Sequence, residues 1–382
     1  MNSMLSSGQS SSLIHRIQQR LSQFPDYRMP FSIYMSSCMY DQEGGYYTKS
    51  SEKVGPAGDF YTSAYIGDAM ALIIERYLQL RCSIREWTDK SYRIVEWGAG
   101  TGKLAEQLLN VLEHSDCRPM EYVIVESSPY HRSKIQERFA NNACPIPVVC
   151  WDEQNYFEQA EEMPIFLVAN ELLDAFPVER IRQRNSKLEQ AYVIWNRDKS
   201  IFEYEWAEVE AHVSQWAVQH DISLHEGQIY DAGMAASEWL GLVLQALGDC
   251  EGLFIDYGDG TRQLTAEHRM NGSLLCYRNH QAYDDPFAAP GDQDMTADVD
   301  FDIAERIAFL SDCEVLPRMD QKQFLVENGV LDLLQNHSDA DPFSEKARSN
   351  RNIRQLLLSD QMSERFKVMA ISKGTGNGQD KQ

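Results

Sequence analysis

Hydrophobic and polar positions along the middle of the chain predict strands that alternate with helices. Short apolar runs are separated by stretches with the spacing of amphipathic helices. The expected strands are residues 94–97, 122–126, 147–151, 165–169 and 253–257, and the helices between them include residues 103–112 and 131–139. Strands joined by helices pair in parallel through right-handed crossovers, so the pattern predicts an open, doubly wound α/β sheet of Rossmann-like type.

A different pattern occupies the region between this fourth and fifth strand. Runs at residues 178–183, 190–195 and 201–206 alternate over short polar turns, which is typical of an antiparallel meander. A helix at residues 233–247 leads back to the sheet. We therefore expect a β-rich insertion that forms a lid or a substrate wall.

The two ends of the chain complete the predicted organisation. A Ser-rich, frayed start precedes helices at residues 13–24 and 65–80, and a late strand at 366–371 is expected to pair antiparallel with residues 314–319. The expected domains are an N-terminal helical extension covering the site (1–90), the core (91–177 and 248–372), the β-rich insertion (178–247) and a tail (373–382).

Three alternating glycines follow the first strand of the sheet. The loop runs from Glu96 through Gly98, Gly100 and Gly102 and enters the next helix at Lys103. Glycines let the backbone approach a ligand closely, and free N–H groups at a helix start favour a nucleotide-like cofactor. A dinucleotide fingerprint needs a third glycine where Lys103 stands. The spacing is instead similar to the S-adenosylmethionine loop of Rossmann-like methyltransferases; the alternative is an ordinary strand-to-helix turn.

Carboxylates follow the next two strands. Glu126 ends the second strand, where a carboxylate can accept hydrogen bonds from both hydroxyls of an adenosine ribose. Asp152 follows the third strand, where enzymes that use S-adenosylmethionine commonly hold the adenine amine. We expect both to bind the cofactor, and Glu96, at the glycine loop, to face its amino-acid half. The alternatives are a surface glutamate and a solvated turn residue.

Polar residues at the end of the fourth strand are the catalytic candidates. Asn170, Glu171 and Asp174 lie where ligands of open sheets bind. Two carboxylates can orient a guanidinium by bidentate hydrogen bonds and localise its charge, although Asp174 could instead cap a helix. His280 is a candidate general base. The Asp-rich stretch after it lacks EF-hand spacing, so we assign no metal.

The net charge, the cysteines and the apolar segments limit which partners and which location we expect. A formal net charge of −23 disfavours binding to nucleic acid or an anionic membrane, but it suits a basic protein segment or a small molecule. The acidity could also serve solubility alone. Eight cysteines without a C-x-x-C pair suit a reducing compartment, and no segment approaches the roughly 20 apolar residues of a membrane span. We expect a bacterial cytoplasmic location, with the mitochondrial matrix as the alternative.

The ordered motifs resemble one family. They are Gly44-Gly45-Tyr46-Tyr47, Gly58-Asp59-Phe60-Tyr61-Thr62-Ser63, Glu96-Trp97-Gly98-Ala99-Gly100-Thr101-Gly102, Val125-Glu126, Ala169-Asn170-Glu171-Leu172-Leu173-Asp174, Ile255-Asp256-Tyr257-Gly258 and Asp294-Met295-Thr296 through Phe301. This order is similar to that of the S-adenosylmethionine-dependent methyltransferase family of MidA, which is related to a mitochondrial complex I assembly factor that methylates arginine.

The resemblance implies a class I methyltransferase fold, S-adenosylmethionine as cofactor and a protein arginine as one acceptor. It places the loop with Gly58 and Thr62 along the site. Three departures lie near the presumed acceptor side: Ala64-Tyr65, Gln228-Ile229-Tyr230, and Asp298 where the family has His.

Three hypotheses follow. The first is a methyltransferase that acts on a protein side chain, with arginine as the favoured acceptor. The second is methylation of a small molecule. The third is a non-catalytic S-adenosylmethionine-binding assembly module. A homodimer is compatible with each.

Overall fold

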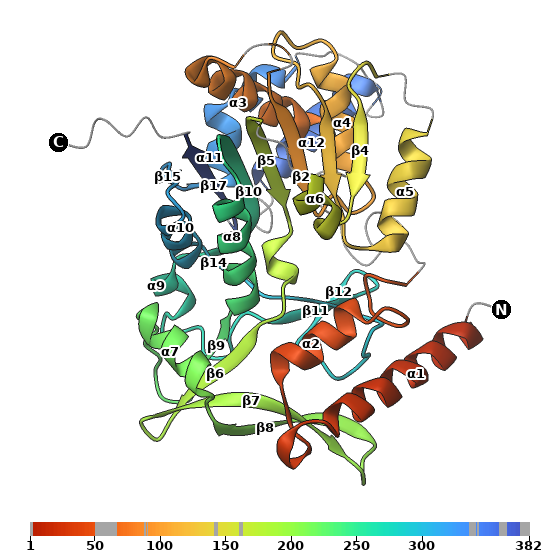
Figure 1. Ribbon diagram of the computed structural model, residues 1–382, viewed down its shortest axis with the longest axis vertical. Helices are drawn as coiled ribbons and strands as arrows, with labels where there is room; N and C mark the ends of the chain where they lie inside the picture. The colour runs from red at the N-terminus through yellow and green to blue at the C-terminus, as the bar shows by residue number, and fades with distance from the viewer. Residues whose placement is uncertain are drawn as a thin grey trace. The chain divides into compact units, whose positions relative to one another are not determined.

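The computed structural model describes residues 3–49, 67–87, 89, 91–140, 144–159, 163–335, 341, 344–358 and 365–374, which fold into two compact units (Figure 1). Unit 1 comprises residues 1–61, 173–239 and 257–304, and unit 2 comprises residues 62–172, 240–256 and 305–382. This division differs from the expected domains in two main respects. Residues 1–90 were expected to form one extension, but residues 1–61 belong to unit 1 and residues 62–90 to unit 2. Residues 257–304 belong with the β-rich insertion, because their short strands share a hydrophobic core with it.

The sheet of unit 2 has a parallel centre, as the alternation of strands and helices predicts. Its order is β15-β17-β10-β5-β2-β3-β4, with β16 on β17. Strand β14 (Val299–Asp300) pairs with the last two residues of β10, Gly258 and Asp259, which belong to unit 1. The strands of the sheet are β2 (Arg93–Trp97), β3 (Tyr122–Val125), β4 (Val148–Trp151), β5 (Ile165–Asn170), β10 (Cys250–Asp259), β15 (Glu314–Val315), β16 (Met319–Asp320) and β17 (Phe366–Lys373). Strands β4, β3, β2, β5 and β10 pair in parallel. The expected antiparallel pairing of the last strand is confirmed, because β17 runs antiparallel to β15 and β16.

The central strands of this sheet are buried throughout, which indicates that helices cover the sheet. Every residue of β2 and β3 is buried, as in parallel sheets covered on both faces. The helices are α3 (Ala69–Arg85), α4 (Lys103–Leu112), α5 (Pro129–Phe139), α6 (Glu153–Gln159), α11 (Gln321–Glu327), η4 (Val330–Leu333) and α12 (Glu345–Leu358). Helices α8 (Met234–Ala246) and α10 (Phe301–Leu310) and strand β10 each run across a boundary between the two units.

Unit 1 contains the predicted antiparallel meander. Its larger sheet has the order β1-β7-β6-β9 with β8 on β7, and its smaller sheet has the order β12-β11-β13. The strands are β1 (Met29–Pro30), β6 (Glu179–Arg184), β7 (Lys187–Asn196), β8 (Ile201–Glu208), β9 (Ile229–Ala232), β11 (Leu275–Arg278), β12 (Gln281–Tyr283) and β13 (Asp294–Thr296). The helices are α1 (Ser3–Leu21), η1 (Pro25–Tyr27), α2 (Phe31–Tyr40), η3 (Leu173–Ala175), α7 (Ala211–Gln219) and α9 (Thr261–Leu264).

The N-terminal helices of unit 1 differ from the sequence prediction. Helix α1 begins at Ser3, although a frayed start was expected up to residue 12. Leu13, Ile17 and Leu21 recur every four residues and are buried, so one face of the helix joins the core of unit 1. Helix α2 was not predicted, because most of its residues are buried and no polar face marks its period.

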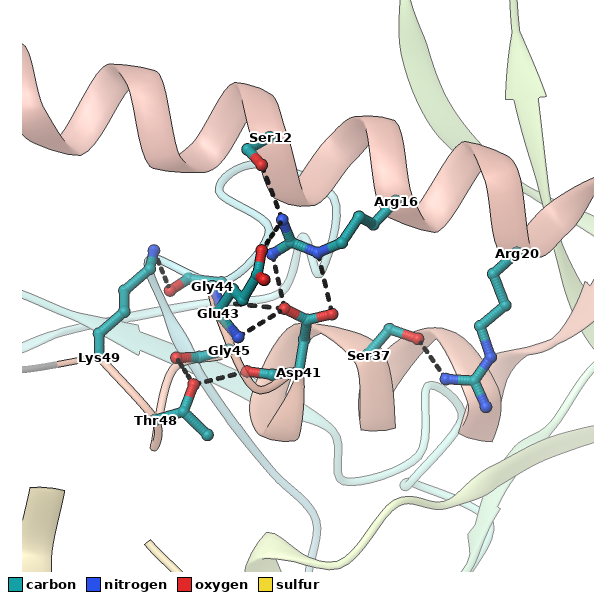
Figure 2. A network of polar contacts seen from close by, with 11 residues as sticks. Ser12, Arg16, Arg20, Ser37, Asp41, Glu43, Gly44, Gly45, Thr48 and Lys49 are labelled. Carbon is teal, nitrogen blue, oxygen red and sulfur yellow. Dashed lines mark hydrogen bonds and ion pairs between the residues drawn. The ribbon is translucent and has the colours of Figure 1, made fainter. Parts of the chain in front are cut away.

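A polar network ties helix α1 to the loop after α2 (Figure 2). The guanidinium of Arg16 donates two hydrogen bonds to the carboxylate of Asp41, at 2.6 and 3.1 Å. The same carboxylate accepts the backbone N–H of Gly44, and Lys49 pairs with Asp292. The Gly44-Gly45 loop is therefore held from several sides. No helix within the described residues has both the length and the apolar character of a membrane span.

Candidate functional site

The glycine loop after β2 requires glycine because three of its residues have left-handed backbones. Gly98, Gly100 and Gly102 have φ values of 73°, 55° and 74°. A side chain is costly in this region of backbone space. The amide of Gly98 donates to the carbonyl of Val125 at 2.8 Å, which ties the loop to the end of β3.

The three glycines differ in the space beside them. A Cβ atom on Gly98 would lie 2.7 Å from Leu172 Cδ1, and one on Gly102 would lie 3.2 Å from both Ile135 and Phe139. A Cβ atom on Gly100 would meet no described atom within 4 Å. The loop is therefore packed at its two ends and open in its middle, at Gly100.

Glu126 lies against this open glycine. Its carboxylate accepts hydrogen bonds from the amides of Gly100 (2.9 Å) and Ser128 (2.8 Å), and His131 Nδ1 lies 3.8 Å away. The side chain is buried. A carboxylate has about four lone-pair sites, so two amide donors leave acceptor capacity for the hydroxyls of a ribose. Glu126 and the open face of Gly100 thus fit the adenosine part of S-adenosylmethionine.

Glu96 lies inside the sheet rather than in the loop. The hydroxyl of Tyr122 donates to its carboxylate at 2.6 Å, and only 3% of the residue is exposed. Burial raises the pKa of Glu96 to about 7; the Tyr122 hydrogen bond opposes this shift and the nearby charge of Glu126 adds to it. That Glu96 faces the amino-acid half of the cofactor stays a prediction.

Asp152 caps the helix after β4. Its carboxylate accepts the backbone N–H and the side-chain amide of Asn155, both at 2.9 Å. This geometry satisfies a free N–H at the start of α6. The side chain is partly exposed, so this cap leaves other lone pairs of the carboxylate open to solvent or a ligand.

Asn170 and Glu171 form a turn at the end of β5. The Asn170 amide donates to the Glu171 carboxylate at 3.1 Å. The other amide atom, Asn170 Oδ1, is buried and has no hydrogen-bond partner among the described residues. A buried acceptor without a partner is costly, which favours a ligand donor at this position. Glu171 is a non-glycine residue with φ of 54°.

The boundary between the two units falls between Leu172 and Leu173, so Asp174 belongs to unit 1. Within unit 1 it belongs to η3 and is buried, and its carbonyl accepts the amide of Ala297 at 3.0 Å. Burial raises the pKa of the Tyr47 hydroxyl well above its usual value, and the charges of Asp294 and Asp174 add to this. Asp174 thus lies close enough to Tyr47, a partly buried residue of its own unit, to affect its pKa.

Three predicted site residues remain, and the structure describes one of them, His280. His280 lies exposed in the two-residue turn between β11 and β12, where it and Asn279 have positive φ. Its role as a general base stays a prediction. Gly58 and Thr62, expected to line the cofactor, lie outside the described residues.

Asp256 is a buried carboxylate of this region that was not among the predicted site residues. It lies on β10 with 1% of its surface exposed, and its Oδ2 accepts the amide of Leu172 at 3.0 Å. The signal was present in the sequence. A carboxylate within the otherwise apolar run at residues 253–257 needs a specific partner.

Residues 73–318 match the family described as "Putative S-adenosyl-L-methionine-dependent methyltransferase". A protein from Burkholderia thailandensis, crystallised with S-adenosyl-homocysteine, has a similar structure. Its TM-score is 0.86 at 27% identity, and the match covers 97% of this chain and 94% of that one. These matches confirm the predicted methyltransferase fold and cofactor.

Two mitochondrial relatives show the same similarity in sequence. The protein arginine methyltransferase NDUFAF7 of Xenopus tropicalis is 26% identical over 376 residues, which cover 89% of this chain and 81% of that protein. Its Drosophila melanogaster homologue is 22% identical over 306 residues, which cover 73% of this chain and 66% of the fly protein. The expected bacterial cytoplasmic location is therefore wrong: these relatives are mitochondrial, and acidity and free cysteines do not distinguish the compartments.

Proposed function

This chain belongs to the S-adenosyl-L-methionine-dependent methyltransferase family that matches residues 73–318, and from this membership we propose that it methylates an arginine side chain of a protein. The bound cofactor supplies an electrophilic methyl group on a sulfonium ion. The observation that carries the proposal is the open face of Gly100 beside the Glu126 carboxylate. This arrangement suits an adenosine whose ribose hydroxyls donate to a carboxylate.

In this proposal the glycine loop and residues at the ends of the strands bind different parts of the cofactor. Gly98, Gly100 and Gly102 let the backbone approach it, and Glu126 accepts the ribose hydroxyls. Asp152 accepts the adenine amine beside its role as a helix cap. Glu96 acts from within the sheet on the amino-acid half. That the loop with Gly58 and Thr62 contributes to the same site rests on the sequence resemblance alone.

The acceptor side rests on the polar turn after β5. Guanidinium carries its charge over three nitrogens, so a carboxylate that binds two of them localises the charge and leaves the third more nucleophilic. Glu171 has this role in the proposal, and Asn170 Oδ1 accepts a hydrogen bond from a ligand donor. Asp174 is proposed as the second carboxylate, and this assignment rests only on its position three residues after Glu171 in the sequence. His280 is the candidate that takes up the released proton.

Labelled S-adenosylmethionine tests the acceptor directly. The wild-type protein and Glu171→Gln are incubated with a lysate that lacks the endogenous protein, and the products are separated into protein and metabolite fractions. We expect wild-type label in the protein fraction, recovered as methylarginine after hydrolysis, and little label with the variant. Label confined to metabolites would identify a small-molecule methyltransferase. Binding of the cofactor without label in either fraction would identify a non-catalytic module.

A further inference from the structure

Strand β10 holds two consecutive backbone donors of the turn after β5. The amide of Glu171 donates to the carbonyl of Ile255 at 2.8 Å, which continues the parallel pairing of the two strands. The next amide, that of Leu172, donates to the carboxylate of Asp256 at 3.0 Å. The ladder of backbone hydrogen bonds thus passes at this point to a side chain.

The change of partner coincides with a left-handed backbone. Glu171, between the two amides, has a φ of 54° although it carries a side chain. Such a conformation is strained and persists only where the surroundings hold it. The hydrogen bonds that the Glu171 and Leu172 amides donate to Ile255 and Asp256 supply this restraint.

After the left-handed Glu171, the side chain of Leu172 packs against Gly98 of the glycine loop. A Cβ atom on Gly98 would lie 2.7 Å from Leu172 Cδ1, so the leucine occupies the space that a side chain at Gly98 would need. On the other side of Glu171, the buried Asn170 Oδ1 has no partner among the described residues. The turn therefore joins the loop, the unpartnered acceptor and the Glu171 carboxylate in one structure.

We propose that Asp256 is a positioning residue for methyl transfer. By accepting the Leu172 amide, its carboxylate fixes the left-handed Glu171 and seats Leu172 against Gly98, which sets the cofactor loop and the Glu171 carboxylate in one geometry. This inference rests on the proposed function for its catalytic meaning. The hydrogen bond itself stands on the structure of unit 2 alone.

The test compares Asp256→Ala with Asp256→Asn, which keeps an acceptor oxygen of similar reach. Glu251→Ala is the matched control, because Glu251 is a buried carboxylate on the same strand that binds Arg81 and Ser372 instead. Four quantities are measured: hydrogen exchange of the Leu172 amide, the dissociation constant for S-adenosyl-homocysteine, kcat and KM. If Asp256→Ala does not fold, Asp256→Ser takes its place.

Loss of the acceptor leaves the partly buried N–H of Leu172 without this partner, so we expect exchange at Leu172 to accelerate about tenfold or more in Asp256→Ala. The dissociation constant should rise about tenfold and kcat should fall by more than KM changes, whereas Asp256→Asn stays within about threefold of wild type. Glu251→Ala should lower stability without these effects.

Wild-type exchange and affinity in Asp256→Ala, or equal changes in Glu251→Ala, would overturn the inference. If the wild-type protein itself fails to bind S-adenosyl-homocysteine, the proposed function fails instead. Exchange at Leu172 then reports separately on whether Asp256 holds the turn.

Discussion

The carboxylate of Glu126 accepts a hydrogen bond of 2.9 Å from the amide of Gly100. The two residues follow neighbouring parallel strands, β3 and β2, whose carboxyl ends lie at the same edge of the sheet. Ligands of open α/β sheets bind beyond this edge. The hydrogen bond joins the restrained glycine loop to the carboxylate that we propose accepts the ribose hydroxyls, and four of the predictions below concern residues around it.

Removal of the Glu126 carboxylate should weaken cofactor binding. Hydrogen bonds to charged groups contribute about 1.5–3 kcal/mol, so Glu126→Ala should raise the dissociation constant for S-adenosyl-homocysteine about 10- to 100-fold. Calorimetry measures this change. Glu121→Ala is the control, because Glu121 pairs with Arg93 before the start of β3. Equal losses in both variants would assign the effect to general stability rather than to the site.

A side chain at Gly100 should block the ligand without a clash inside the protein. Gly100→Leu projects into space that is free of described atoms within 4 Å. Gly227→Leu is a matched control: Gly227 also has a positive φ, of 80°, and among the described residues a Cβ atom there would meet only Met270 Cε, at 3.8 Å. Both variants should lose about 1–2 kcal/mol to backbone strain, but only Gly100→Leu should abolish binding. Normal affinity in Gly100→Leu would exclude a ligand beside this glycine.

The pH dependence of stability should change in Glu96→Gln. Burial raises the pKa of Glu96 from 4.5 to about 7, so its ionisation opposes the folded state. Its stabilising contribution is complete below about pH 4.5 and is lost as the pH rises through about 7. Glu96→Gln should therefore flatten the fall in melting temperature over this window. Glu179, whose pKa burial also raises to about 7, should maintain the remaining slope. An unchanged profile would contradict the shift at Glu96.

The core of the fold was predictable because its signals are local. The helix predicted at residues 103–112 is α4 (Lys103–Leu112), and the strand predicted at 165–169 is β5 (Ile165–Asn170). Continuous apolar runs between glycines and helix starts determine such elements within a few residues. Helix α2 was missed because a helix that is buried nearly all round has no amphipathic period.

Loss of the Glu171 carboxylate should impair catalysis more than binding. In the proposed function Glu171 orients the acceptor, so Glu171→Gln should lower kcat about 100-fold while the dissociation constant for S-adenosyl-homocysteine stays near the wild-type value. Methylation kinetics and calorimetry on the same preparation separate the two effects. Asp174→Asn provides the comparison for the second carboxylate. A wild-type kcat in Glu171→Gln would remove this residue from the mechanism.

The conformation of Glu171 lay beyond the sequence. Its carboxylate was predictable from its place after a core strand, but its left-handed backbone depends on Asp256, 84 residues from Leu172 in the chain. Asp152 has a local role that its own hydrogen bonds show, as the cap of helix α6, while its contact with the adenine amine stays a prediction. Local pattern identifies which residues are present, whereas long-range contacts decide what each side chain binds.

The Gly44-Gly45 loop should tolerate no added methyl group at its second glycine. A Cβ atom on Gly45 would lie 2.5 Å from Asp41 N and 2.8 Å from Met39 O, both backbone atoms that cannot move independently. Gly45→Ala should cost about 1–3 kcal/mol of stability, as overpacking does. Gly248→Ala, where a Cβ atom meets no described atom within 4 Å, should cost less than half of that. Urea unfolding compares them, and equal midpoints would contradict the packing of this loop.

Calorimetric titration with S-adenosyl-homocysteine is the most direct measurement of the central claim, that the loop at Gly100 and the Glu126 carboxylate form the cofactor site of a methyltransferase. The account predicts saturable binding by the wild-type protein, weaker binding by Glu126→Ala and none by Gly100→Leu. Absence of binding by the folded wild-type protein, or undiminished binding by both variants, would contradict it.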